Sequence, residues 1–270
     1  MISRVAIYFL FLEEFIYLGR NGRGVHMRGV VLAGGLGTRF HPVTRVVNKH
    51  LLDVFDEPMV FYPIKTLKRA GVRELVLVTG HEIEQFEELL GDGSELGVDI
   101  CYARQDASGG IAEALGLAAH LIHDQPCVVI LGDNIFQEDL KPYVDDYSAQ
   151  GSGAKLLLKQ VGLDDAKRFG VARIDGDQMV DIVEKPQQPP SDLVVTGCYM
   201  YDERVFEIIR GLKPSGRGEL EITDVNNAYV RSGEATFDVL RGWWTDAGTP
   251  ASKLKASILV ALAKGVTFHA

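Results

Sequence analysis

GVVLAGGLGTR, residues 29–39, joins an apolar run to a glycine-rich turn and decides how the chain is organised. Residues 29–33 are apolar and rich in valine, which is typical of a strand covered on both faces. Gly34, Gly35 and Gly37 allow the backbone to turn tightly and to approach a ligand closely. Consecutive N–H groups in such a turn form a concavity that binds anions. We therefore predict a strand followed by a phosphate-binding loop.

The end of this loop separates it from two well-known phosphate-binding patterns. Arg39, which follows Thr38, adds a permanent charge with forked donors that fit phosphate oxygens. A Walker A loop ends in Gly-Lys-Ser/Thr, which residues 37–39 do not match, and Phe40 stands where a dinucleotide-binding loop has its third glycine. A nicotinamide dehydrogenase is therefore excluded. Residue chemistry alone leaves both a phosphate site and a plain strand–turn–helix connection open.

Apolar runs and helical patterns alternate along the first half of the chain. We predict strands at residues 29–33, 75–79, 98–102 and 127–131, with helices at 59–70, 82–90 and 111–123. Strands that alternate with helices form a mostly parallel sheet with helices on both faces. The predicted fold class is α/β.

The pattern changes after about residue 150. We predict strands at residues 154–161, 171–174, 179–183 and 194–201, and helices at 203–210, 219–231 and 250–264. This part is interpreted as a smaller mixed sheet that packs on the first part and forms a cleft with it. The domain is expected to span residues 27–270, divided into 27–150 and 151–270. Residues 1–26 are expected to be an extension outside the core, because their apolar run is too short to span a membrane and lacks a cleavage site.

Composition restricts the partners and the compartment. The net charge is −9, so a broad nucleic-acid surface is not expected, and a polyanionic ligand must be attracted by a few placed cations. Cys101, Cys127 and Cys198 lie in apolar stretches without a C-x-x-C pair, which is typical of buried thiols in a reducing compartment. We expect a cytoplasmic protein that binds neither nucleic acid nor a membrane.

Nine motifs carry a resemblance to a known family. They are GVVLAGGLGTRFHPVT, NKHLL, EPMVFYP, LGDNIF, FGV, VEKP, VTGCYMYD, GRGELEITDVN and WWTDAGT. In order and spacing the chain resembles the short bacterial glucose-1-phosphate thymidylyltransferases from residue 27 to about 264. The resemblance implies a Rossmann-like nucleotidyltransferase fold with a smaller sugar-binding part. It also implies that dTTP and α-D-glucose 1-phosphate give dTDP-glucose and pyrophosphate with Mg²⁺, in an enzyme expected to be a homo-oligomer.

The resemblance implies a metal site and a triphosphate site. Asp133 and Asp246 match the magnesium ligands, and Asp133 follows a predicted strand at the edge where α/β sheets bind ligands. Arg39 and Lys49 match the catalytic cations that hold the triphosphate and stabilise the departing pyrophosphate. The nucleotide-binding set comprises Gly34, Gly35, Gly37, Thr38, Arg39, Lys49, Gln105, Gly110 and Asp133. Without the resemblance, either aspartate is a turn or cap residue and Lys49 a surface lysine.

The sugar-phosphate set implied by the resemblance is Asn134, Gly170, Glu184, Lys185, Val195 and Arg217. A carboxylate such as Glu184 accepts hydrogen bonds from sugar hydroxyls, and an ammonium such as Lys185 pairs with phosphate. Considered alone, Glu-Lys is a common surface pair, and Arg217 would form a salt bridge beside a helix start.

The sequence departs from the family pattern at Leu36, Asp53, Glu57 and Phe169, which bears on selectivity for sugar and base more than on the reaction. Two alternatives stay open. Uracil and thymine share a pairing edge, and one methyl group is worth only about 1–3 kcal/mol, so a UTP-using uridylyltransferase is the first. The second is a non-catalytic regulatory protein that binds a nucleotide sugar.

Overall fold

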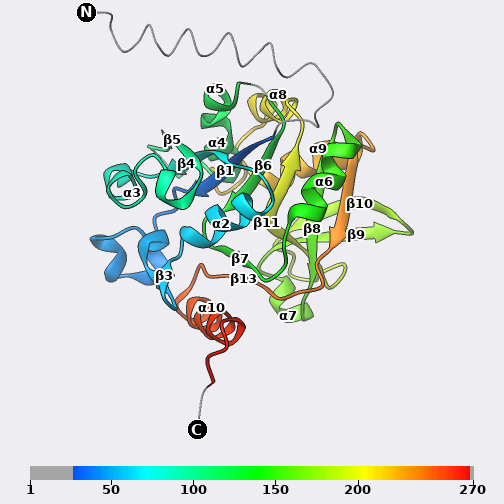
Figure 1. Ribbon diagram of the computed structural model, residues 1–270. Helices are drawn as coiled ribbons and strands as arrows, with labels where there is room; N and C mark the ends of the chain where they lie inside the picture. Colours follow the sequence, from blue (N-terminus) through cyan, green and yellow to red (C-terminus); the bar gives the residue numbers. More distant parts are fainter. Residues whose placement is uncertain (1–26, 107, 124, 268–270) are drawn as a thin grey trace, which may run out of the picture.

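The computed structural model describes residues 27–106, 108–123 and 125–267 (Figure 1). The expected extension, residues 1–26, lies outside the described residues. The strands on either side of residue 150 belong to one sheet. The predicted division of the domain at that point stays a prediction.

A nine-stranded sheet forms the centre of the molecule (Figure 1). Strands β6, β1, β4 and β5 are parallel neighbours, while β11 pairs antiparallel with β6 and connects β8, β9, β10 and β12 to them. The sheet strands are β1 Arg28–Ala33, β4 Glu74–Thr79, β5 Asp99–Arg104, β6 Cys127–Leu131, β8 Ala154–Gln160, β9 Gly170–Asp175, β10 Gln178–Glu184, β11 Leu193–Tyr201 and β12 Ala235–Val239. The predicted α/β fold with a largely parallel centre is confirmed.

Helices cover both faces of this sheet. Alternate residues of β1 enter opposite layers, because successive side chains of a strand point to opposite faces. Val31 packs in the layer of α2, α3 and α6, whereas Leu32 packs in the layer of α4, α8 and α9. The helices are α2 Phe61–Arg69, α3 Ile83–Leu90, α4 Ile111–Leu117, α5 Ala119–Ile122, α6 Lys141–Gln150, α7 Leu163–Ala166, α8 Val205–Gly211, α9 Ile222–Arg231 and α10 Pro250–Ala263. In the described ranges, no helix combines the length and apolarity needed to cross a membrane.

Two sequence predictions need correction. Cys101 was expected to be buried but is exposed, because β5 is the edge strand and alternate residues of it face outward. Cys127 and Cys198 are buried as predicted. The helix predicted over residues 219–231 begins at Ile222, because Leu220 is held in an extended segment in which its N–H donates to the carbonyl of Gly109 at 2.7 Å.

Two short ladders were not predicted. β7 Asn134–Phe136 pairs antiparallel with β13 Trp244–Asp246, and β2 Asp53–Val54 pairs with β3 Glu57–Pro58. Strands of two or three residues are too short to show a hydrophobic period. The first ladder determines the site, because it places Asn134 opposite Asp246 although they are 112 positions apart in the chain. Helix α10 begins next to this ladder with a capping box between Thr249 and Ser252 (Figure 1).

Candidate active site

The predicted site residues gather at the edge of the sheet where the parallel strands end. Gly34 follows β1, Gln105 follows β5, and Asp133 comes two residues after β6. The carboxyl ends of parallel strands meet at one edge, which is where open α/β sheets bind ligands.

The glycine loop lies between Gln105 and Lys49. A Cβ atom built on Gly34 would come within 2.6 Å of Gln105 Oε1, and one on Gly35 would be 3.6 Å from Lys49 Cε. Gly37 has a φ of +60°, a left-handed conformation that glycine adopts readily, and its carbonyl accepts a hydrogen bond from Thr44 Oγ1 at 2.7 Å. Close approach at Gly34 and backbone conformation at Gly37 therefore favour glycine, whereas a Cβ atom on Gly35 would make only ordinary contact.

The two predicted catalytic cations differ in their surroundings. Arg39 is exposed in the 3₁₀ turn Thr38–Phe40 and forms no ion pair with another described residue. Lys49 is in the 3₁₀ turn Lys49–Leu51, and its Nζ lies 2.5 Å from Asp133 Oδ2. Arg39 therefore stays available for an anion at the loop, while Lys49 links the loop to the carboxylates.

Asp133 and Asp246 lie close together. A Cβ atom on Gly248 would be 2.6 Å from Asp246 Oδ1 and 3.1 Å from Asp133 Oδ2, so both carboxylates flank the same point. The β7–β13 ladder and a 2.8 Å hydrogen bond from the N–H of Ala247 to the carbonyl of Asp133 hold the two segments together. The structure thus brings together the two aspartates that the resemblance pairs, and their role as metal ligands stays a prediction.

The two carboxyls have opposite pKa shifts. Burial acts to raise the pKa of Asp133, but the adjacent Lys49 ammonium outweighs it, so the pKa lies below its ordinary value. Burial and the negative charge of Asp133 raise the pKa of Asp246. Asp133 is therefore charged at neutral pH. The two carboxyls form a site of negative potential, and a cation bound there would stabilise the charged form of both.

The donor set suits magnesium better than zinc. Within the described ranges, no group of three or more His, Cys, Asp or Glu side chains could hold a metal ion. Two carboxylates alone match the habit of Mg²⁺, which is bound by one or two carboxylates and takes its other ligands from phosphates and water.

Asn134 and Trp244 fix the segment that carries Asp133. Asn134 Oδ1 accepts hydrogen bonds from Trp244 Nε1 at 2.7 Å and from the N–H of Gly197 at 2.9 Å. Its Nδ2 donates to Asp133 Oδ1 at 3.0 Å. Asn134 is 2% exposed, so its side chain is fixed in the interior, and its hydrogen bond to Asp133 Oδ1 positions that carboxylate. A direct contact of Asn134 with the sugar phosphate stays a prediction.

Replacing Trp244 with phenylalanine should destabilise the fold by about 1 kcal/mol, because one hydrogen bond is lost while Gly197 still satisfies Asn134. For a chain of this size the melting temperature should fall by about 2–4 °C in a thermal scan. Trp243→Phe is the matched control, because its indole N–H has no hydrogen-bond partner among the described residues. Equal melting temperatures for the two variants would contradict the role given to Trp244.

The predicted sugar-phosphate residues form a second group. Gly170 of β9 lies opposite Glu184 of β10. Glu184 Oε2 accepts a hydrogen bond from Thr223 Oγ1 at 2.6 Å, and Oε1 lies 3.2 Å from Lys185 Nζ and 3.6 Å from Arg217 Nη2. Glu184 therefore meets both predicted phosphate-binding cations.

Val195 and Arg217 complete the group. Val195 lies in β11 beside Val194, which pairs with Val171 of β9. Arg217 also pairs with Glu221 at 2.8 Å, which is the salt bridge beside a helix start that residue chemistry alone suggested. Its Nη2 also lies 3.6 Å from Glu184 Oε1, and a contact of Arg217 with the sugar phosphate stays a prediction.

The two groups meet through Arg168 and Trp244, which the sequence did not single out as site residues, and through Phe169, which was noted only as a departure from the family pattern. Arg168 Nη2 lies 3.7 Å from Asp246 Oδ2, and the rings of Phe169 and Trp244 meet edge to face with centroids 5.2 Å apart. The contact of Gly109 with Leu220 joins the segment that carries Arg217 to the segment of Gln105 and Gly110, the two residues that by the resemblance match the family's nucleobase contacts. In the sequence, Arg168 is two positions before Gly170, and Trp244 is two positions before Asp246. This closeness to predicted site residues is the signal that could have identified them.

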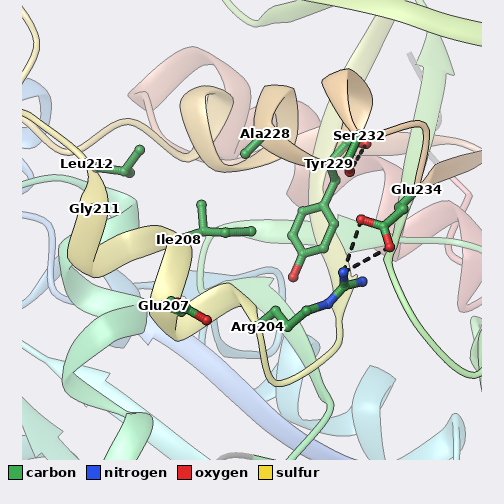
Figure 2. Close-up of a pocket in the computed structure, with 9 residues that line it drawn as sticks. All are labelled: Arg204, Glu207, Ile208, Gly211, Leu212, Ala228, Tyr229, Ser232 and Glu234. Atoms are coloured by element: carbon green, nitrogen blue, oxygen red, sulfur yellow. Dashed lines mark hydrogen bonds and ion pairs between the residues drawn. The ribbon is translucent and has the colours of Figure 1, made fainter.

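A groove of about 510 Å³ lies away from these residues, between α8 and α9 (Figure 2). Arg204 points into it but is already paired with Asp202 at 2.6 Å and Glu234 at 2.9 Å. None of the predicted site residues lines this groove. With its arginine neutralised by two carboxylates, the groove does not compete with the sheet edge as a phosphate site.

Comparisons with known proteins show the family to which the chain belongs. A family profile described as nucleotidyl transferase matches residues 28–261. The glucose-1-phosphate thymidylyltransferase of Neisseria meningitidis is 42% identical over 239 residues, covering 87% of this chain and 82% of that protein. A Bacillus anthracis protein assigned as a glucose-1-phosphate thymidylyltransferase, solved in complex with sucrose, matches with a TM-score of 0.83 and 46% identity over 90% of this chain and 98% of that chain.

A second solved structure is more distant. A UDP-glucose pyrophosphorylase complexed with UDP-glucose matches with a TM-score of 0.79 and 26% identity over 88% of this chain and 99% of that chain. The profile, the sequence identity and the fold agree with one another. The chain therefore belongs to the nucleotidyl transferase family and, within it, to the glucose-1-phosphate thymidylyltransferases.

Proposed function

We propose that this protein transfers a thymidylyl group from dTTP to α-D-glucose 1-phosphate, giving dTDP-glucose and pyrophosphate. The observation that carries the proposal is the placement of Asp133 and Asp246 between the two groups of predicted residues. On one side, Lys49 of the loop segment pairs with Asp133. On the other, Arg168 lies 3.7 Å from Asp246, and the carbonyl of the next residue, Phe169, accepts a hydrogen bond from the N–H of Lys185 at 2.9 Å. The name and sequence identity of the thymidylyltransferase relatives support the choice of substrates.

The chemistry needs positioning and charge neutralisation more than a protein nucleophile. A phosphate oxygen of the sugar phosphate forms a bond to the α-phosphorus of dTTP, and the bond from that phosphorus to the bridging β-oxygen breaks, so pyrophosphate leaves with the electron pair. Arg39 and Lys49 stabilise the leaving group, while Lys185 and Arg217 hold the attacking phosphate against its repulsion by dTTP. Glu184 accepts hydrogen bonds from the sugar hydroxyls.

We further propose that Asp133 and Asp246 hold Mg²⁺ when both substrates are present. The ion would supply neutralisation of the charge on the α-phosphate. Lys49, which pairs with Asp133 in this structure, would then turn its ammonium to the phosphates.

The test is pyrophosphate release from the purified protein with magnesium and glucose 1-phosphate, run separately with each nucleoside triphosphate. We expect turnover with dTTP and weaker turnover with UTP, because one methyl group adds only about 1–3 kcal/mol in an apolar site. A rate with UTP above that with dTTP would favour the uridylyltransferase alternative, which the fold of the UDP-glucose pyrophosphorylase supports. No release with any triphosphate would favour a binding protein.

The setting of the enzyme is part of the proposal. Two fully buried thiols, Cys127 and Cys198, suit the reducing cytoplasm. A homo-oligomer is proposed, and sedimentation velocity at micromolar concentration would reveal a monomer if this is wrong.

A further inference from the structure

The side-chain amide of Gln105 is held in one orientation. Its Nε2 donates to Glu113 Oε2 at 2.7 Å and to the carbonyl of Gly110 at 3.2 Å, so both of its hydrogens are in use. A carboxylate and a carbonyl are acceptors only. Turning the amide over would place Oε1 against two acceptors, and both hydrogen bonds would be lost.

This orientation directs Oε1 of Gln105 to the glycine loop. The oxygen lies where a side chain on Gly34 would collide with it, at 2.6 Å from the Cβ position. The main chain of Gln105 is fixed at the sheet edge, because its N–H donates to the carbonyl of Thr79 at the end of β4 at 2.8 Å. Gln105 therefore presents one hydrogen-bond acceptor, and no donor, on the side where the loop lies.

Glu113 is itself fixed in the first turn of α4. Its Oε2 also accepts a hydrogen bond from the N–H of Gly109 at 3.0 Å. Gly110, which precedes the helix, has a φ of +100°, and a Cβ atom on it would lie 2.4 Å from the carbonyl oxygen of Leu220. The turn that carries these contacts is therefore tied to a second segment of the chain, and the carboxylate has a defined position.

We propose that Glu113 sets the nucleobase preference of this enzyme by holding Gln105 as an acceptor. The inference rests on the proposed nucleotidyl transfer and on the nucleobase contact that the resemblance implies for Gln105. An acceptor at this place pairs with a pyrimidine whose N3 carries a hydrogen, as in thymine and uracil, and repels the unprotonated N3 of cytosine. Glu113 acts through Gln105 and is a positioning residue. A glutamine in its place could donate as well as accept, so the amide of Gln105 could adopt either orientation.

The experiment compares dTTP with 5-methyl-dCTP, which carries the same methyl group and differs only at the pairing edge. For the wild-type enzyme we expect kcat/KM to favour dTTP by at least about 10²-fold. Glu113→Gln should lower this ratio by about tenfold to a hundredfold, the effect of losing a hydrogen bond to a charged partner. Glu88→Gln, the same charge change at an exposed position of α3, should leave the ratio unchanged.

A double-mutant cycle tests whether Glu113 acts through Gln105. In a Gln105→Ala background, Glu113→Gln should cause no further fall in the ratio. A further fall there would overturn the proposal, as would a Glu113→Gln variant that slows both triphosphates equally. Equal use of the two triphosphates by the wild-type enzyme would overturn it without any variant. If no triphosphate is turned over, the proposed function fails, and the same preference is then measured from calorimetric dissociation constants of the wild-type protein.

Discussion

Asp133→Asn should lower kcat/KM for dTTP by about 10³, because the change removes the negative charge that pairs with Lys49 and half of the carboxylate pair. The asparagine keeps the size of the side chain and an oxygen that can still accept from Asn134 Nδ2. The loss should therefore be one of catalysis and not of folding. Pyrophosphate release measured over a range of Mg²⁺ concentrations, together with a melting curve, separates the two.

The control for this variant is Asp177→Asn, an equal charge change in the exposed turn between β9 and β10. It should retain wild-type turnover and wild-type magnesium dependence. Calorimetric titration of Mg²⁺ in the presence of dTTP gives a readout apart from activity, and Asp133→Asn should weaken the binding. Turnover of Asp133→Asn within tenfold of the wild type would remove Asp133 from its proposed role.

A buried histidine should make the fold sensitive to acid. His50 is 2% exposed, its Nδ1 lies 2.9 Å from Asn48 Oδ1, and a Cβ atom on Gly132 would come within 2.8 Å of its ring. Burial and, next, the charge of Lys49 lower its pKa from 6.5 to about 3. The unfolded chain therefore takes up a proton below pH 6.5, while the folded chain does so only near pH 3.

This difference makes stability fall as the pH falls through that window. Between pH 7.5 and pH 5, His50 should account for a loss of about 2 kcal/mol in the free energy of unfolding. Urea unfolding at the two pH values measures the total loss. His50→Gln should reduce the loss by that amount, whereas His120→Gln, at an exposed position of α5, should not. An unchanged pH dependence in His50→Gln would show that the ring is protonated in the folded protein.

The strands that could be predicted from the sequence are those with a long apolar run. β1, β4 and β6 bury nearly every residue, so each is a continuous run that needs no tertiary context to be read. The burial prediction for Cys101 was wrong because β5 lies at the edge of the sheet. The order of the strands in the sheet determines that position, and the local sequence does not show it. β7 and β13 carry no local signal, because three residues are stabilised only by the partner strand that the fold supplies.

The sequence alone determined the α/β class and the glycine loop, because local periodicity is written along the chain. The candidate site residues came from the resemblance of its motifs to the thymidylyltransferases. The tertiary structure decided their relations. It placed Asp246 beside Asp133 through the β7–β13 ladder, Arg168 beside Asp246, and Glu113 behind Gln105. The longest-range of those contacts join segments about a hundred residues apart. Such contacts depend on which strands are neighbours in the sheet, and no local sequence pattern contains that information.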